Sequence, residues 1–175
     1  MNGHPGGTEH TRRMIALADL PEGACVLDMG AGSGEAVRLL RAAGYDARGI
    51  DRESSGEGVE QGDFLHMPYP DGRFDAALSQ CAFFVSGDVQ AALREAHRVL
   101  KPGGTLLLSD VFFEEPVPLL ERAGFSVSIL EDMTDVWREY YLEALWRGES
   151  CECALPRGRC CYWLIIGRRS SNGFV

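Results

Sequence analysis

The sequence predicts a single α/β domain in three layers, with a seven-stranded, mostly parallel sheet between helices. Three observations support this prediction. Apolar runs alternate with helical patterns along most of the chain, which is typical of β-α-β units. The apolar runs show little polar alternation, as expected for strands that are buried on both faces. A length of 175 residues suits one hydrophobic core, so we expect residues 1–175 to form one domain.

Seven segments are predicted to form strands. The clearest are residues 24–29 (ACVLDM) and 105–113 (TLLLSDVFF), which are continuous apolar runs. The full set, in chain order, is 24–29, 46–51, 58–63, 74–79, 105–113, 125–130 and 160–167. Because helical patterns separate most of these strands, we expect neighbouring strands to be mostly parallel, with helices on both faces of the sheet.

Five helices are predicted from apolar residues at helical spacing. The first ends before Pro21, and the second ends at Gly44, a residue typical of a helix C-terminus. The helices span residues 11–20, 35–43, 88–100, 118–123 and 135–146. Residues 1–9 are rich in Gly, His and Pro, and we expect them to form a flexible leader.

The composition limits the class of partner. The formal net charge is -9, and nucleic acids are bound through clustered Lys and Arg, so no nucleic-acid partner is expected. No segment is long and apolar enough to span a bilayer, so no membrane partner is expected. The first residues lack the basic and apolar regions of a secretory signal. We therefore expect a cytoplasmic protein.

A glycine-rich turn is the central motif of the sequence. Residues 26–34 (VLDMGAGSG) run from a predicted strand into a predicted helix, which is the context that a nucleotide-binding turn requires. Asp51 ends the second strand, about 20 residues further on, where a carboxylate can bind ribose hydroxyls. Glu35 stands where the dinucleotide fingerprint G-x-G-x-x-G has its third glycine. A carboxylate there would repel the negatively charged pyrophosphate of a dinucleotide but not a cationic sulfonium ligand. A nicotinamide-dependent oxidoreductase is therefore disfavoured.

Four segments in this order resemble class I S-adenosylmethionine-dependent methyltransferases of the small-molecule branch. They are VLDMGAGSGEAVRLL (26–40), GIDRE (49–53), GDFLHMPYPDGRFDAAL (62–78) and EAHRVLKPGGTLLLSD (95–110). The resemblance implies a Rossmann-like fold with an antiparallel last strand, and S-adenosylmethionine as the cofactor. It also implies methyl transfer to a small-molecule acceptor by in-line displacement. A catalytically silent S-adenosylmethionine-binding sensor or assembly partner is the alternative.

The resemblance also implies which residues contact the cofactor. Gly30, Ala31, Gly32 and Gly34 would line its methionine and ribose, and Asp28 would lie beneath the amino-acid end.

On the nucleoside side, Asp51 would bind the ribose hydroxyls, with Arg52 beside the adenine. Asp63 would accept a hydrogen bond from the adenine amino group, with Phe64 against the face of the ring.

Ser79 and Gln80, with Cys81 beyond them, would lie near the methyl group that is transferred. Simpler roles stay open for three of the residues assigned here, because Phe64 and Cys81 are also consistent with core positions, and Arg52 with a solvated charge.

The acceptor side is less defined in the sequence, although we expect residues 1–20, the loop after Ser79 and the helix over residues 135–147 to build the acceptor pocket. The resemblance implies a substrate-side insertion at residues 132–159, whose helix carries Trp137, Tyr140, Tyr141 and Trp146. Aromatic residues at helical spacing are more often core than ligand-binding. A homodimer or a protein partner could complete the site. O, N, C, S and metalloid acceptors all stay open at this point.

Four cysteines crowd into the last quarter of the chain: Cys151, Cys153, Cys160 and Cys161. Four thiolates could hold zinc or an iron–sulfur centre, and this alternative stays open. Because their C-x-C and C-C spacing differs from the C-x-x-C of ordinary zinc sites, no metal ligand is assigned to them.

Overall fold

The computed structural model describes residues 4–53, 56–148 and 160–170. Within these residues it forms one seven-stranded sheet in the order β3-β2-β1-β4-β5-β7-β6. The pairs from β3 to β5 are parallel, and β7 is antiparallel to both β5 and β6. The predicted Rossmann-like architecture, with an antiparallel last strand, is confirmed.

The predicted strands and helices are all present, with shifted ends in some cases. The strands are β1 (Cys25–Met29), β2 (Asp46–Asp51), β3 (Val59–Gln61), β4 (Phe74–Gln80), β5 (Leu100–Phe112), β6 (Phe125–Asp132) and β7 (Cys161–Arg169). The helices are α1 (Gly7–Ala18), α2 (Glu35–Ala42), α3 (Val89–Val99), α4 (Val117–Arg122) and α5 (Thr134–Trp146).

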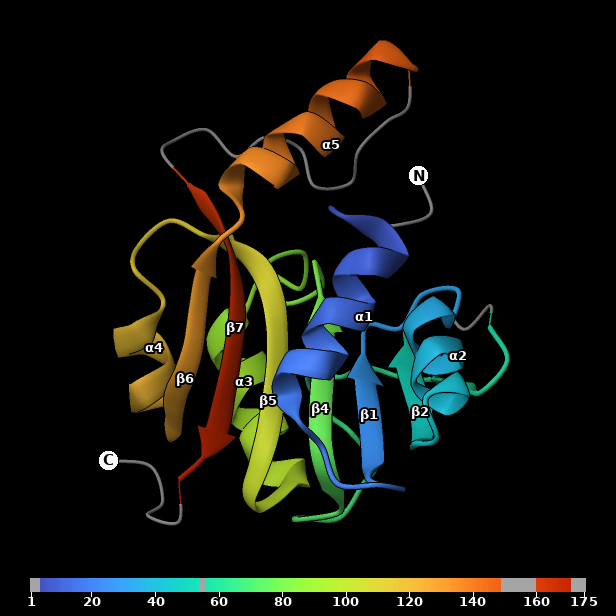
Figure 1. Ribbon diagram of the computed structural model, residues 1–175. Helices are drawn as coiled ribbons and strands as arrows, with labels where there is room; N and C mark the ends of the chain where they lie inside the picture. The colour runs from blue at the N-terminus through green and yellow to red at the C-terminus, as the bar shows by residue number, and fades with distance from the viewer. Residues whose placement is uncertain (1–3, 54–55, 149–159, 171–175) are drawn as a thin grey trace.

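The helices cover the two faces of the sheet as two layers (Figure 1). Helices α1 and α2 pack on one face, where Met14 and Val37 join strand residues such as Val26 in one core cluster. Helices α3 and α4 pack on the other face, where Leu93 and Leu120 join a second cluster. Helix α5 lies beyond the edge at which the parallel strands end (Figure 1). The carboxyl ends of these strands are therefore flanked by the start of α1 and by α5.

Two elements, α1 and β5, begin four or more residues before the start that the sequence predicts. Helix α1 begins at Gly7 rather than at residue 11, so the last three residues of the expected flexible leader are helical. The earlier start adds His10 to the buried face of the helix, next to Thr11. Strand β5 begins at Leu100, because this fully buried residue pairs with Phe74 before a register shift resumes the ladder at Thr105.

Among the described helices, none combines the length and the apolar character needed to cross a bilayer.

Candidate functional site

Backbone hydrogen bonds hold the glycine loop, residues 30–34, against the end of β2. The amides of Gly30 and Ala31 donate to the carbonyl of Ile50 at 2.9 and 3.2 Å. The amide of Gly32 donates to Asp51 Oδ2 at 2.8 Å. The loop and the acidic end of β2, which are separate in the sequence, thus form one surface at the carboxyl edge of the parallel strands. Ligands of such sheets bind at this edge.

Packing explains why the loop needs glycine at Gly30. Its φ is +83°, and a Cβ there would lie 2.3 Å from the Cβ of Ala82. Gly49 on β2 faces the loop in the same way, since a Cβ there would lie 2.4 Å from the Cβ of Ala31. At Gly32 (φ +48°), by contrast, a Cβ would meet nothing within 4 Å. The loop is therefore packed on its inner side and open at Gly32, as a backbone cradle for a ligand requires.

Two carboxyl groups flank the cradle in different environments. Asp51 accepts from Gly32 with one oxygen and from the Glu53 amide at 2.9 Å with the other. An ionised carboxylate has about four acceptor positions, so Asp51 keeps capacity for further donors such as ribose hydroxyls. Asp28 is 3% exposed. Burial, with a smaller contribution from the charge of Asp51, raises the pKa of Asp28 to about 7.

The residues expected at the adenine side lie beyond the ends of β2 and β3. Arg52 Nη2 forms an exposed ion pair with Asp63 Oδ2 at 3.0 Å. The other oxygen of Asp63 accepts from the Leu65 amide at 2.9 Å. Phe64 is 7% exposed and stacks on Phe83, with ring centroids 5.8 Å apart. Phe64 therefore belongs to the core cluster, while a Cβ built at Gly30 would lie 3.5 Å from its ring edge.

Ser79 and Gln80 at the end of β4 have different surroundings. Ser79 is fully buried, and its hydroxyl donates to the carbonyl of Met29 at 2.8 Å, directly before Gly30. Its observed contact therefore supports the glycine loop from below. Gln80 faces α1, where its Oε1 accepts from the Thr11 hydroxyl at 3.1 Å. Its Nε2 lies 3.3 Å from Nδ1 of His4.

A group of polar side chains, here named the β4-end cluster, surrounds this point. Its members come from the N-terminal segment, α1, the end of β4 and the start of β7: His4, His10, Thr11, Gln80, Cys81 and Tyr162. Tyr162 Oη lies 3.3 Å from Cys81 Sγ and 2.7 Å from the hydroxyl of Ser109. Cys81 adopts φ 56°, which is uncommon for a residue other than glycine.

Beside the cluster, the loop after β4 is held by a buried carboxylate. Asp110 on β5 accepts from the amides of Phe83 at 2.8 Å and Phe84 at 3.2 Å with one oxygen, and from that of Val111 at 2.8 Å with the other. Burial nevertheless raises the pKa of Asp110 to about 6.

No sequence motif singled out His10, Thr11, Asp110 or Tyr162 as individual site residues. For α1 a signal was present, because buried positions 10, 11, 14, 15 and 18 follow the helical period. The expected leader over residues 1–9 concealed it. Tyr162 had no such signal, because only the antiparallel pairing of β7 brings it to this edge.

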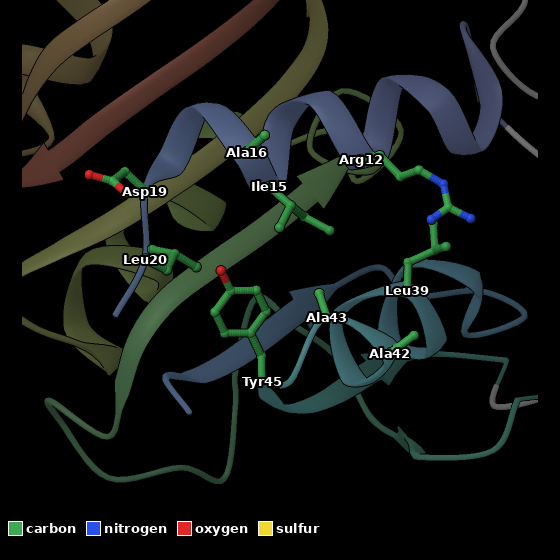
Figure 2. Close-up of a pocket in the computed structure, with 9 residues that line it drawn as sticks. All are labelled: Arg12, Ile15, Ala16, Asp19, Leu20, Leu39, Ala42, Ala43 and Tyr45. Atoms are coloured by element: carbon green, nitrogen blue, oxygen red, sulfur yellow. The ribbon is translucent and has the colours of Figure 1, made fainter. Parts of the chain in front are cut away.

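A hollow of about 310 Å³ lies elsewhere, between the later turns of α1 and α2. Figure 2 shows the ring of Tyr45 pointing from the α2 side toward Ile15 and Leu20. Both helices reach this region at the amino edge of the parallel strands, where Leu20 precedes β1 and Tyr45 precedes β2. The hollow is therefore separate from the glycine loop and has none of its backbone donors.

The four C-terminal cysteines fall into two groups. Cys151 and Cys153 lie outside the described residues. Cys160 and Cys161 are free thiols beside a hollow of about 380 Å³ that Asp132, Asp135 and Arg138 also line. Burial raises the pKa of Cys160. Within the described part of the chain, no group of three or more His, Cys, Asp or Glu side chains is arranged to hold a metal.

The aromatic residues of α5 divide between core and surface. Trp137 and Tyr141 are buried, and Trp137 packs with Val111, Cys160 and Tyr162. Trp146 is 88% exposed. The expected insertion at residues 132–159 thus contributes Trp137 to the edge near the site, and its role toward a substrate stays a prediction.

The sheet order, the glycine loop and the acidic end of β2 form the arrangement that the resemblance to class I S-adenosylmethionine-dependent methyltransferases implied. Residues 27–108, just under half of the chain, match the family model described as the methyltransferase domain.

Similar proteins agree with this assignment. The chain is 36% identical over 94 residues to malonyl-[acyl-carrier protein] O-methyltransferase 1 of Coxiella burnetii, covering 50% of this chain and 33% of that protein. It is 34% identical over 113 residues to demethylmenaquinone methyltransferase of Thermus thermophilus, covering 55% and 51%. The chain thus spans between a third and about half of the length of these two relatives.

A solved methyltransferase structure resembles this chain in its fold. The geranyl diphosphate C-methyltransferase from Streptomyces coelicolor A3(2), in complex with S-adenosyl-L-homocysteine among other ligands, superposes with a TM-score of 0.73. The match covers 93% of this chain and 79% of that one at 15% sequence identity. At this identity the likeness concerns the fold.

Proposed function

We propose that this chain binds S-adenosylmethionine at the glycine loop and catalyses transfer of its methyl group to a small-molecule acceptor. The observation that carries the proposal is the hydrogen bond of 2.8 Å between the Gly32 amide and Asp51 Oδ2. It joins an open backbone cradle to a carboxylate that has acceptor capacity left, as a nucleoside ligand requires.

The residues present fit this cofactor. Asp51 would accept hydrogen bonds from the ribose hydroxyls, and Gly30, Ala31, Gly32 and Gly34 would line the methionine and ribose. Ser79 would act indirectly, since its hydroxyl holds the Met29 carbonyl before the loop.

Asp28 would lie beneath the amino-acid end of the cofactor. On the adenine side, Arg52, Asp63 and Phe64 would form the boundary, with the Arg52–Asp63 ion pair orienting the Asp63 carboxylate. Gln80 would face the methyl group, fixed by its contacts to Thr11 of α1 and to His4 before this helix.

When bound, S-adenosylmethionine supplies an activated methyl group, so the protein has to supply alignment and a site that excludes water. The packed inner side of the glycine loop and the buried end of β4 serve this purpose. Relatives named for malonyl-[acyl-carrier protein] and demethylmenaquinone, together with the net charge of -9, support an acceptor other than nucleic acid. The expected homodimer or protein partner stays a prediction that light scattering can test.

Calorimetric titration with S-adenosylmethionine, S-adenosylhomocysteine and NAD tests the cofactor assignment. We expect both adenosyl ligands to bind. Asp51→Ala is expected to lower the affinity for both at least tenfold, which corresponds to about 1.4 kcal/mol of binding free energy. Asp46→Ala is the matched control, because Asp46 is an exposed carboxylate at the other end of the same strand. Binding of NAD alone, or an unchanged affinity in Asp51→Ala, would contradict the proposal.

Turnover separates an enzyme from the silent alternative. Release of S-adenosylhomocysteine in the presence of a small-molecule acceptor panel is expected for a methyltransferase. Cofactor binding without turnover across a broad panel would favour a sensor or an assembly partner.

A further inference from the structure

The buried imidazole of His10 on α1 indicates a bound ligand. The residue is 5% exposed to solvent. Neither ring nitrogen has a hydrogen-bond partner among the residues that the structure describes. Leaving a buried polar group without a partner costs about 1–3 kcal/mol, so such groups are uncommon in native proteins and require an explanation. A bound molecule that supplies the missing partner is one.

The surroundings of His10 place it over the end of β4. Its ring centroid lies 6.0 Å from that of His4 and 6.5 Å from that of Tyr162. His4 in turn contacts Gln80, with 3.3 Å between the two nitrogens. Tyr162 contacts Cys81, with 3.3 Å between oxygen and sulfur. The imidazole is therefore flanked by the residues that contact the last residue of β4 and the first residue after it.

The end of β4 is continuous with the glycine loop. Strands β1 and β4 are paired in parallel up to Asp28 and Leu78. Beyond this pair, Ser79 holds the Met29 carbonyl, and Gly30 packs against Ala82. A ligand on the open side of the loop would therefore have the β4-end cluster as its neighbour.

The cluster presents uncharged hydrogen-bonding groups. Burial lowers the pKa of His10 to about 4, with smaller effects from His4, Arg13 and Glu131. Burial also lowers the pKa of His4, although its backbone hydrogen bond and the charge of Glu35 act in the opposite direction. For Tyr162, burial raises the pKa well above its usual value. All three rings are thus neutral near pH 7.

Charged groups around the cluster do not favour an anion. Arg13 on α1 is engaged by Glu131 of β6, with 2.6 Å between Nη2 and Oε2. Asp110 is occupied by three backbone amides, and Glu35 is itself acidic. A carboxylate or phosphate placed beside His10 would therefore be desolvated without a cation committed to it, which is unfavourable.

We propose that His10 is an acceptor-binding residue, in which a ring nitrogen accepts a hydrogen bond from a neutral O–H or N–H group of the methyl acceptor. This inference rests on the proposed function and deepens it by naming the substrate class. The acceptor is uncharged at its reacting end, as in an alcohol, a phenol or a neutral amine, and carries no carboxylate or phosphate there.

Fluorinated probes test the proposal without knowledge of the natural substrate. The protein is first saturated with S-adenosylhomocysteine and then titrated with 4-fluorophenol, 4-fluoroaniline and 4-fluorobenzoate, followed by ¹⁹F NMR. In parallel, ¹⁵N-histidine labelling reports on the ring nitrogens of His10, which are assigned by their loss in His10→Phe. We expect at least one neutral probe to bind and to shift the His10 nitrogens, while His97 on α3 does not shift. The benzoate is expected to do neither.

Two variants identify the contribution of the imidazole. His10→Phe keeps an aromatic ring but has no ring nitrogen. It is expected to lower the affinity for the neutral probe at least tenfold. His10→Gln retains an acceptor and is expected to bind the probe more tightly than His10→Phe. His66→Phe is the matched control, since it makes the same substitution at an exposed histidine. Its affinity for the probe is expected to stay unchanged.

Three results would overturn the inference: binding of the benzoate as tight as that of the phenol, no shift at His10 with either neutral probe, or unchanged affinity in His10→Phe. Failure of the proposed function is distinguishable, because it appears earlier, as absent binding of S-adenosylhomocysteine in the first step.

Discussion

Gly30 and Ala82 lie so close together that a methyl group on Gly30 would overlap the Ala82 side chain, with 2.3 Å between the two Cβ atoms. This contact joins the loop after β1 to the segment after β4. The surface that would hold the cofactor and the surface that would hold the acceptor therefore share one packed boundary. A change at either residue is expected to affect both.

Gly30→Ala should lower both the stability and the affinity for S-adenosylhomocysteine. The positive φ of +83° costs a non-glycine residue about 1–2 kcal/mol, and overpacking adds roughly 1–3 kcal/mol. Gly23→Ala is the matched control, because Gly23 has φ +70° but a Cβ there meets nothing within 4 Å. Urea denaturation and calorimetry measure the difference. Equal losses in the two variants would show that the contact with Ala82 is unimportant.

Asp28→Asn should change how stability depends on pH. The pKa of Asp28 is raised to about 7 in the folded protein, so the folded state retains a proton that the unfolded state has lost. This contribution to stability is complete below about pH 4 and disappears as the pH rises through 7. Relative to Asp28→Asn, the wild type is therefore expected to lose a few kcal/mol between pH 5 and pH 8, since one pKa unit corresponds to about 1.4 kcal/mol.

Denaturation curves at several pH values check this expectation. Asp46→Asn, at the exposed start of β2, is the control and should run parallel to the wild type. A stability difference between wild type and Asp28→Asn that is independent of pH would contradict the prediction.

Asp110→Asn should destabilise the loop after β4. The carboxylate accepts three backbone amides, and the amide group of asparagine turns one acceptor position into a donor. We expect a loss of roughly 1–3 kcal/mol at pH 8, where the carboxyl is ionised. Asp88→Asn should be nearly neutral, because Asp88 caps α3 through the Ala91 amide and asparagine caps equally well. Similar losses in both variants would argue against a special role for Asp110.

Two tryptophans of α5 should behave differently on truncation. Trp137 is 3% exposed and packs with Tyr162, whereas Trp146 is 88% exposed. Trp137→Ala is expected to lower the free energy of unfolding by about 3–5 kcal/mol. Trp146→Ala is expected to change it by no more than about 0.5 kcal/mol. Thermal unfolding of the two variants provides the comparison. A large loss in Trp146→Ala would show that this side chain is covered in solution, for example by a second copy of the chain.

The local pattern of the sequence was sufficient to predict most of the fold. The strand ending at Met29, the turn at Gly30 and the carboxylate at Asp51 each depend on short-range signals, namely apolar runs, glycines and spacing. The antiparallel direction of β7 came from the family resemblance, because periodicity does not encode strand direction. Helix α1 was predicted to begin four residues too late, since glycine, histidine and proline suggested a loop over residues 1–9, where the helix already begins at Gly7.

The candidate site was predictable residue by residue only on its cofactor side, and on the acceptor side only as segments of the chain. Ser79 was expected near the methyl group, and the structure shows its hydroxyl directed to the Met29 carbonyl, a contact that depends on strand pairing. The contact between Cys81 and Tyr162 joins residues that are 81 positions apart in the sequence, and no local sequence pattern predicts it. Residues that follow one another in a motif were thus predictable, whereas individual residues that only the topology brings together were not.

The antiparallel course of β7 also has a consequence for the order of folding. Tyr162 lies at the start of this strand and meets His10 from the first helix, so the β4-end cluster depends on contacts of very long sequence separation. Such contacts carry the largest loop-closure cost and tend to form late. The glycine loop, by contrast, depends on contacts between β1, α2 and β2 that are close in the sequence, so we expect it to form before the β4-end cluster. Ring shifts of His10 would then report on completion of the native state, later than any signal from the loop.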